Sequence, residues 1–114
     1  MSDIKRDSPR FAVSIYMFYE GRAAGQLRAE DLSATGFLAK GRLAAEPGDS
    51  LRATFHVFPA SGEREVKVEG SVMNKRHEGD ETLVGVRITD FGSEAEKKSY
   101  LEFVRELAAD VGEL

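Results

Sequence analysis

The chain has 114 residues, of which 41% are hydrophobic and 32% are charged, and this length suffices for one hydrophobic core but not for two domains. It contains no cysteine, which excludes a disulfide framework and a thiolate metal site and favours a cytoplasmic location. The formal net charge of −4 argues against a broad contact with nucleic acid, and neither a signal peptide nor an apolar run of about 18 residues indicates a membrane segment.

The first ten residues carry a local cluster of positive charge. Lys5, Arg6 and Arg10 are cationic, against two acidic side chains in the same stretch. Pro9 restricts its own φ and pushes the preceding residue toward extended conformations, so this stretch is predicted to be neither helix nor free coil. We therefore interpret residues 1–10 as a flexible arm that can present arginine to an anionic group.

Six segments with strand character follow the arm. In the first, 11–19, apolar side chains recur with a period of two on one face, and the other face is also apolar, which predicts a strand covered on both sides. Turn signals separate the segments, for example at Glu46-Pro47-Gly48-Asp49, and the polar stretch 75–81 is interpreted as a loop. The other strands are expected at 26–32, 37–43, 51–58, 66–72 and 84–88.

A helix is predicted from about residue 94 to 109, because the period of the apolar residues changes there to 3.6. Ser93 is a good N-cap, and acidic residues in the first turn suit the positive end of the helix. Six strands and one terminal helix indicate a mainly β fold, an antiparallel barrel covered by the helix, since closure removes exposed strand edges. We expect Tyr16 and Phe18 to pack in the core against the apolar stripe of the helix. That stripe includes Tyr100, Leu101, Val104 and Leu107.

Two short motifs carry the functional prediction. They are Arg6-x-x-x-Arg10 in the arm and Asp31-x-Ser33-x-x-Gly36 at a turn after the second predicted strand. Arginine presents a planar set of donors that can pair two phosphate oxygens or the O6 and N7 edge of guanine. A carboxylate matches the N1–H and N2–H₂ donors of guanine, and a serine hydroxyl can reach a phosphate oxygen or a backbone group. Glycine permits a positive φ or a close approach of the backbone to a ligand.

This pair of motifs resembles the RxxxR and [D/N]xSxxG signature of the PilZ family, bacterial domains that bind the second messenger cyclic di-GMP. The resemblance extends over nearly the whole chain, and it implies a six-stranded Greek-key barrel with a C-terminal helix over residues 11–114. A basic residue directly before the first arginine, here Lys5, implies that the ligand binds as a stacked, intercalated pair. The implied ligand-binding residues are Lys5, Arg6, Arg10, Asp31, Ser33 and Gly36.

The resemblance further implies a receptor rather than an enzyme. The arm would close over cyclic di-GMP, and the changed surface would signal to a second, unidentified protein in the control of motility, adhesion or biofilm formation. No metal, nucleic acid polymer or membrane is expected as a partner. The chain is expected to be a monomer or a weak homodimer.

Two other functions remain open. The barrel can be an adaptor that binds no ligand and acts through protein contacts, although both motifs are present. It can also bind single-stranded nucleic acid by aromatic stacking, although the acidity of the chain and the absence of Trp weigh against this. His56 and His77 lack partners at the spacing of metal ligands. Three further arginines could extend the basic site but are interpreted as solubilising surface residues: Arg28, Arg42 and Arg76.

Overall fold

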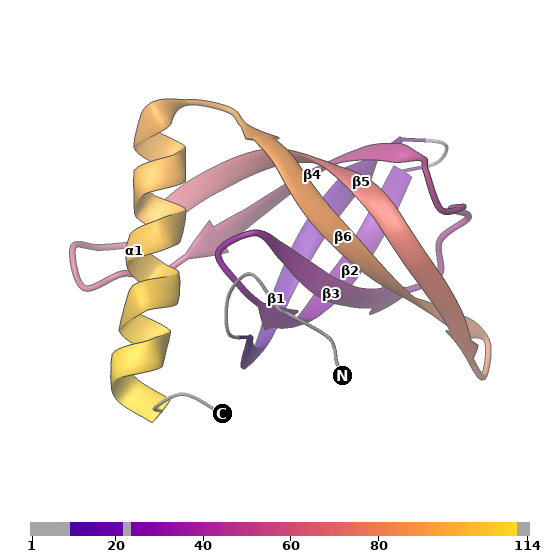
Figure 1. The fold of residues 1–114 in the computed structure, drawn as a ribbon, viewed down its shortest axis with the longest axis horizontal. Coiled ribbons are helices and arrows are strands. Elements are labelled where there is room, and N and C mark those ends of the chain that lie inside the picture. The colour runs from indigo at the N-terminus through magenta and orange to yellow at the C-terminus, as the bar shows by residue number, and fades with distance from the viewer. Residues whose placement is uncertain (1–9, 22–23, 112–114) are drawn as a thin grey trace, which may run out of the picture.

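The computed structural model describes residues 10–21 and 24–111. They form a closed barrel of six antiparallel strands with one helix beside it, as the sequence predicts (Figure 1). The order around the barrel is β1-β2-β3-β6-β5-β4, so β4 returns to lie beside β1 and completes a Greek key. The elements are β1 (Phe11–Glu20), β2 (Ala24–Leu32), β3 (Gly36–Gly41), β4 (Ser50–Val57), β5 (Arg64–Glu78), β6 (Glu81–Phe91) and α1 (Glu94–Val111).

The core lies inside the barrel and extends to the helix. Successive residues of a strand point to opposite faces, so one face of each strand fills the interior. Phe55 packs edge to face against Phe37 and Tyr100, with ring centroids 6.3 and 5.9 Å apart. Because Tyr100 belongs to α1, the helix contributes to the same core. Aliphatic side chains fill much of the remaining interior, among them Met17, Leu27, Leu32, Val57, Val66, Val68, Val72 and Val84.

Ser93 caps α1, as predicted. Its hydroxyl accepts a hydrogen bond from the N–H of Glu96 at 3.1 Å and donates one to the Glu96 carboxylate at 3.0 Å. The same carboxylate accepts a hydrogen bond from the N–H of Lys67 in β5 at 2.6 Å, which ties the start of the helix to the barrel wall. Within residues 10–21 and 24–111, no helix is both long enough and apolar enough to cross a bilayer.

The outer face of β1 is not covered, contrary to the prediction from the sequence. Tyr16 and Phe18 are 62% and 64% exposed, whereas Met17 and Tyr19 between and after them are buried. The error has a simple cause, because the apolar character of the second face was taken as a sign of burial, whereas large apolar side chains also occur on protein surfaces. Tyr100 of the helix packs instead against Phe55 of β4 and Phe91 of β6.

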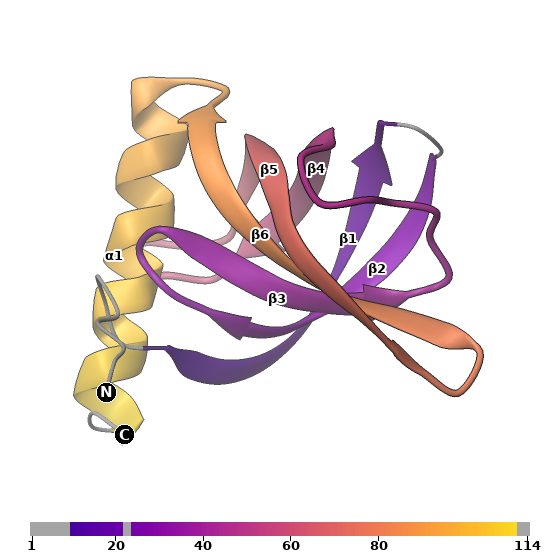
Figure 2. The same ribbon diagram turned by 45° about the vertical axis from the view of Figure 1, so that its right-hand side comes forward.

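The stretch 75–81, predicted as a loop, is instead the end of a long hairpin. β5 and β6 pair as far as Glu78 and Glu81, and the turn consists of Gly79, with a φ of +64°, and Asp80. Two-residue turns that begin with glycine join antiparallel strands closely. The hairpin projects beyond the barrel on the side away from α1 (Figure 2). Other boundaries differ less: the third strand ends at Gly41 and the helix continues to Val111.

Candidate functional site

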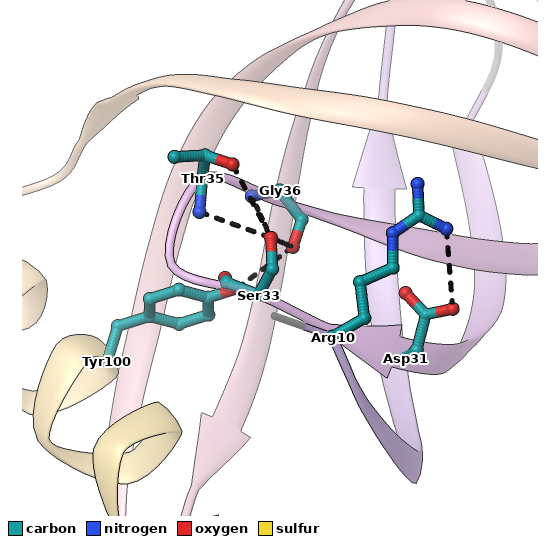
Figure 3. A network of polar contacts seen from close by, with 6 residues as sticks. All are labelled: Arg10, Asp31, Ser33, Thr35, Gly36 and Tyr100. Atoms are coloured by element: carbon teal, nitrogen blue, oxygen red, sulfur yellow. Dashed lines mark hydrogen bonds and ion pairs between the residues drawn. The ribbon is translucent and has the colours of Figure 1, made fainter. Parts of the chain in front are cut away.

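The base of the predicted arm and the end of β2 lie at the same end of the barrel. In the β1–β2 ladder, Phe11 pairs with Leu32 and Ala12 pairs with Asp31. As a result, Nη1 of Arg10 lies 3.9 Å from Oδ2 of Asp31, and Figure 3 shows the two side chains turned toward each other. Their side chains are 47% and 20% exposed, so a guanidinium and a carboxylate stand side by side at a partly accessible surface, with Oδ1 of Asp31 buried.

Four of the six predicted site residues lie within the described part of the chain, and all four are at this end of the barrel. Arg10 and Asp31 form the ion pair, and Ser33 and Gly36 form the adjoining β2–β3 turn. Lys5 and Arg6 lie outside the described residues, so their roles stay predictions.

Ser33 holds the turn between β2 and β3. The residue is buried, and its hydroxyl accepts hydrogen bonds from the N–H groups of Thr35 at 3.3 Å and Gly36 at 3.2 Å. Its own N–H donates to the Gly36 carbonyl at 2.9 Å. Of the two contacts expected for this hydroxyl, the contact with backbone groups is therefore present. A contact with phosphate stays a prediction.

Gly36 is needed where β3 meets β6. A Cβ atom at this position would lie 2.2 Å from the carbonyl oxygen of Val86, a separation that the backbone cannot accept. The φ of Gly36 lies outside the left-handed region. The structure thus supplies a reason for this glycine that the sequence did not suggest, a close approach between two strands rather than an unusual φ.

Helix α1 reaches the same turn through Tyr100. The phenolic hydroxyl donates to the carbonyl oxygen of Ser33 at 2.7 Å and lies 3.3 Å from that of Gly36 (Figure 3). The tyrosine is fully buried, and burial raises its pKa well above the ordinary value. The negative charge of Asp31 raises this pKa further. The stripe pattern placed Tyr100 in the core, but its contact with the turn depends on tertiary structure and has no sequence signal.

The raised pKa of Tyr100 leads to a prediction about alkaline stability. The unfolded tyrosine loses its proton near pH 10, whereas the folded one keeps it, so the folded state binds more protons above about pH 10. The stabilisation from the Tyr100 hydroxyl is fully present below the pKa of the unfolded tyrosine. It is lost as the pH rises through the pKa of the folded tyrosine. We expect Tyr100→Phe to lower the free energy of unfolding by about 1 kcal/mol at neutral pH and to reduce its decline above pH 10.

Urea unfolding of both proteins between about pH 8 and pH 11 measures this difference. Tyr16→Phe is the matched control, because Tyr16 is exposed and the variant should follow the wild-type curve. Equal alkaline slopes for the wild type and Tyr100→Phe would contradict the prediction.

The strand arginines differ in whether a carboxylate neutralises them. The three arginines interpreted as surface residues each contact a carboxylate, so little of their positive charge is left for an anionic ligand. The pairs are Arg28–Glu30 at 2.6 Å, Arg42–Asp80 at 2.7 Å and Arg76–Glu78 at 3.0 Å. Arg87 was not singled out from the sequence. It is exposed, pairs with Gly36 in the β3–β6 ladder, and contacts no acidic side chain among the described residues. Only the strand register reveals that it lies beside the motif.

The histidines occupy exposed positions away from this site. His56 contacts the carboxylate of Glu63, and Nδ1 of His77 lies 3.4 Å from the hydroxyl of Thr82. In the part of the chain that the structure describes, no group of three or more His, Cys, Asp or Glu side chains could hold a metal ion.

Comparison with known proteins agrees with the fold. The PilZ domain family matches residues 4–106. Among solved structures, the chain is similar to the Bacillus subtilis inhibitor of motility MotI/DgrA, with a TM-score of 0.77 and 12% identity. That similarity covers 95% of this chain and 54% of the other, so this chain spans about half the length of that protein. No curated protein shows a significant match. Since the family match covers most of the sequence, the chain belongs to the PilZ domain family.

Proposed function

We propose that this PilZ domain binds cyclic di-GMP in the cytoplasm and signals to a partner protein in the control of motility, adhesion or biofilm formation. The observation that carries the proposal is the approach of Arg10 to Asp31 at 3.9 Å, because it joins one residue of each motif at an accessible surface. PilZ domains are receptor and adaptor domains, and the proposed role involves no catalysis.

The residues of the site have distinct proposed roles. Arg10 pairs with a phosphate or with the O6 and N7 edge of guanine, and the carboxylate of Asp31 accepts the N1–H and N2–H₂ donors. Ser33 and Gly36 keep the turn in place. Arg6 supplies the second guanidinium when residues 1–10 close over the ligand, and Lys5 favours binding of the ligand as an intercalated pair.

An adaptor that acts through protein contacts alone is the second candidate. The exposed aromatic side chains of Tyr16 and Phe18 on the outside of β1 favour it, since they form an apolar area that a partner protein can cover. The similar solved structure is named as an inhibitor of motility, which also fits an action through another protein. The two candidates differ in whether the isolated chain binds the nucleotide.

Isothermal titration with cyclic di-GMP and cyclic di-AMP tests the proposal. The wild-type chain should bind cyclic di-GMP at two molecules per chain and prefer it to cyclic di-AMP, because adenine lacks the two donors that Asp31 accepts. Asp31→Asn should weaken cyclic di-GMP binding by about tenfold or more, since an amide places a donor against those donors.

Thermal unfolding of Asp31→Asn provides the control, because loss of binding has meaning only if the variant stays folded. Absence of binding heat with the intact wild-type chain would favour the adaptor. Equal affinity for the two cyclic dinucleotides would contradict the role of Asp31.

A further inference from the structure

The strand register places four residues in one row across the barrel. Asp31 of β2 pairs with Leu38 of β3, Leu38 pairs with Gly85 of β6, and Gly85 pairs with Asn74 of β5. Neighbouring strands are about 4.8 Å apart, so the row is about 14 Å long. It starts at the carboxylate of the proposed site and continues away from β1.

This row lies on the outside of the barrel. The residues beside it along β2, β3 and β6, namely Leu32, Phe37 and Val84, are buried in the core. Because successive side chains of a strand point to opposite faces, Asp31, Leu38 and Gly85 face outward, and Asn74 pairs with Gly85 on the same side. The row is therefore available to a ligand.

The two middle residues of the row, Leu38 and Gly85, are uncharged and form what we call the floor, and the amide of Asn74 lies at its far end. Gly85 has no side chain, and a Cβ atom there would lie 2.9 Å from Oδ1 and 3.2 Å from Nδ2 of Asn74. The carboxamide of Asn74 thus extends over the Cα of Gly85. Asn74 is exposed, and its side chain makes no hydrogen bond with any described residue. Leu38 completes the floor as a half-buried apolar side chain.

Arg87 stands beside this floor. It lies two residues beyond Gly85 on β6, about 7 Å along the strand, and its side chain faces outward because Val86 between them is buried. The row on the other side of the floor contains Arg28 and Arg76, both held by carboxylates. Arg87 is the cation next to the floor that can pair with a phosphate without first leaving an acidic partner among the described residues.

We infer that Asn74 and Arg87 hold a second base and a second phosphate of the bound cyclic dinucleotides, an inference that rests on the proposed function. The proposed pair of cyclic dinucleotides presents four bases and four phosphates, and Asp31 and Arg10 can satisfy one of each. The second guanine lies over Leu38 and exchanges hydrogen bonds above Gly85 with the carboxamide of Asn74, which is both a donor and an acceptor. Arg87 pairs with the phosphate nearest to the turn.

Titration of the full chain with cyclic di-GMP tests both residues. Arg87→Gln keeps much of the side-chain length and removes the charge, so affinity should fall about tenfold or more and its dependence on salt should weaken. Asn74→Ala removes the carboxamide and should lower affinity about three- to tenfold. Arg105→Gln is the matched control, because Arg105 is an exposed arginine on α1, and its affinity should equal that of the wild type.

A second measurement does not depend on the stability of a variant. The side-chain NH₂ resonances of Asn74, identified by their loss in Asn74→Ala, should shift when cyclic di-GMP is added to the wild-type chain. Unshifted resonances, or an affinity within about twofold of the control for either variant, would overturn the role of that residue. If the variants bind normally and Arg10→Ala does not, the proposed function stands and this inference fails. If the wild type does not bind, both fail.

Discussion

Replacement of Arg10 by alanine is expected to weaken the binding of cyclic di-GMP by at least about 100-fold, the largest effect of any single substitution at the site. Two losses combine. The ligand loses a charge-assisted contact that arginine can make with two hydrogen bonds, and Asp31 loses the guanidinium 3.9 Å away that offsets its repulsion of a phosphate. Isothermal titration at fixed, low ionic strength measures the change, because salt screens exposed charges.

Arg52→Ala is the matched control for this substitution. Arg52 also lies beside a carboxylate, that of Glu20 at 3.8 Å, but this pair is at the opposite end of β1. Both variants lose an exposed cation from the same barrel, so a general effect of net charge would appear in both. A similar loss of affinity in the two variants would contradict the assignment of Arg10 to the site.

Replacement of Gly36 by alanine is expected to destabilise the fold by about 3 kcal/mol or more. The new methyl group would lie 2.2 Å from the carbonyl oxygen of Val86, so β3 and β6 would have to separate at a point where they are paired. The turn that carries Ser33 would move with β3, and ligand binding would weaken even in the molecules that remain folded. Guanidinium unfolding followed by circular dichroism measures the free energy.

Gly25→Ala provides the comparison. A Cβ atom at Gly25 would lie 3.2 Å from the ring of Tyr19, an overlap that a shift of a few tenths of an ångström relieves. We expect a cost below about 1 kcal/mol, close to that of an ordinary surface substitution. If the two alanine variants unfold at the same denaturant concentration, the close approach of β3 to β6 is not what requires glycine at position 36.

Local sequence signals predicted much of the fold. Ser93 could be identified as a cap because the side-chain chemistry of capping acts within one helical turn, and the structure has both hydrogen bonds. The hairpin at Gly79 and Asp80 had a recognisable glycine-first turn signal, but the charged residues around it suggested a loop. On the β5 side of the turn Arg76, His77 and Glu78 are all exposed, so that part of the strand need not alternate between apolar and polar residues.

The site could be predicted only where its residues are close in sequence. Asp31, Ser33 and Gly36 belong to one short motif, and their shared turn follows from that spacing. The neighbours that complete the site come from strands and a helix far along the chain. Arg87 reaches the motif through the register of β3 and β6, and Tyr100 does so through the packing of α1. Neither the register nor the packing can be read from periodicity.

The hydrogen bond from Tyr100 to the carbonyl of Ser33 has a consequence for the recognition of related sequences. A related chain can contain both motifs and still have a less stable loop if its C-terminal helix provides no phenolic hydroxyl for that oxygen. Phenylalanine would preserve the aromatic packing but would leave a desolvated acceptor beneath the loop. A tyrosine seven positions after the helix cap is therefore a useful third feature to compare among related sequences, in addition to the amino-terminal signature.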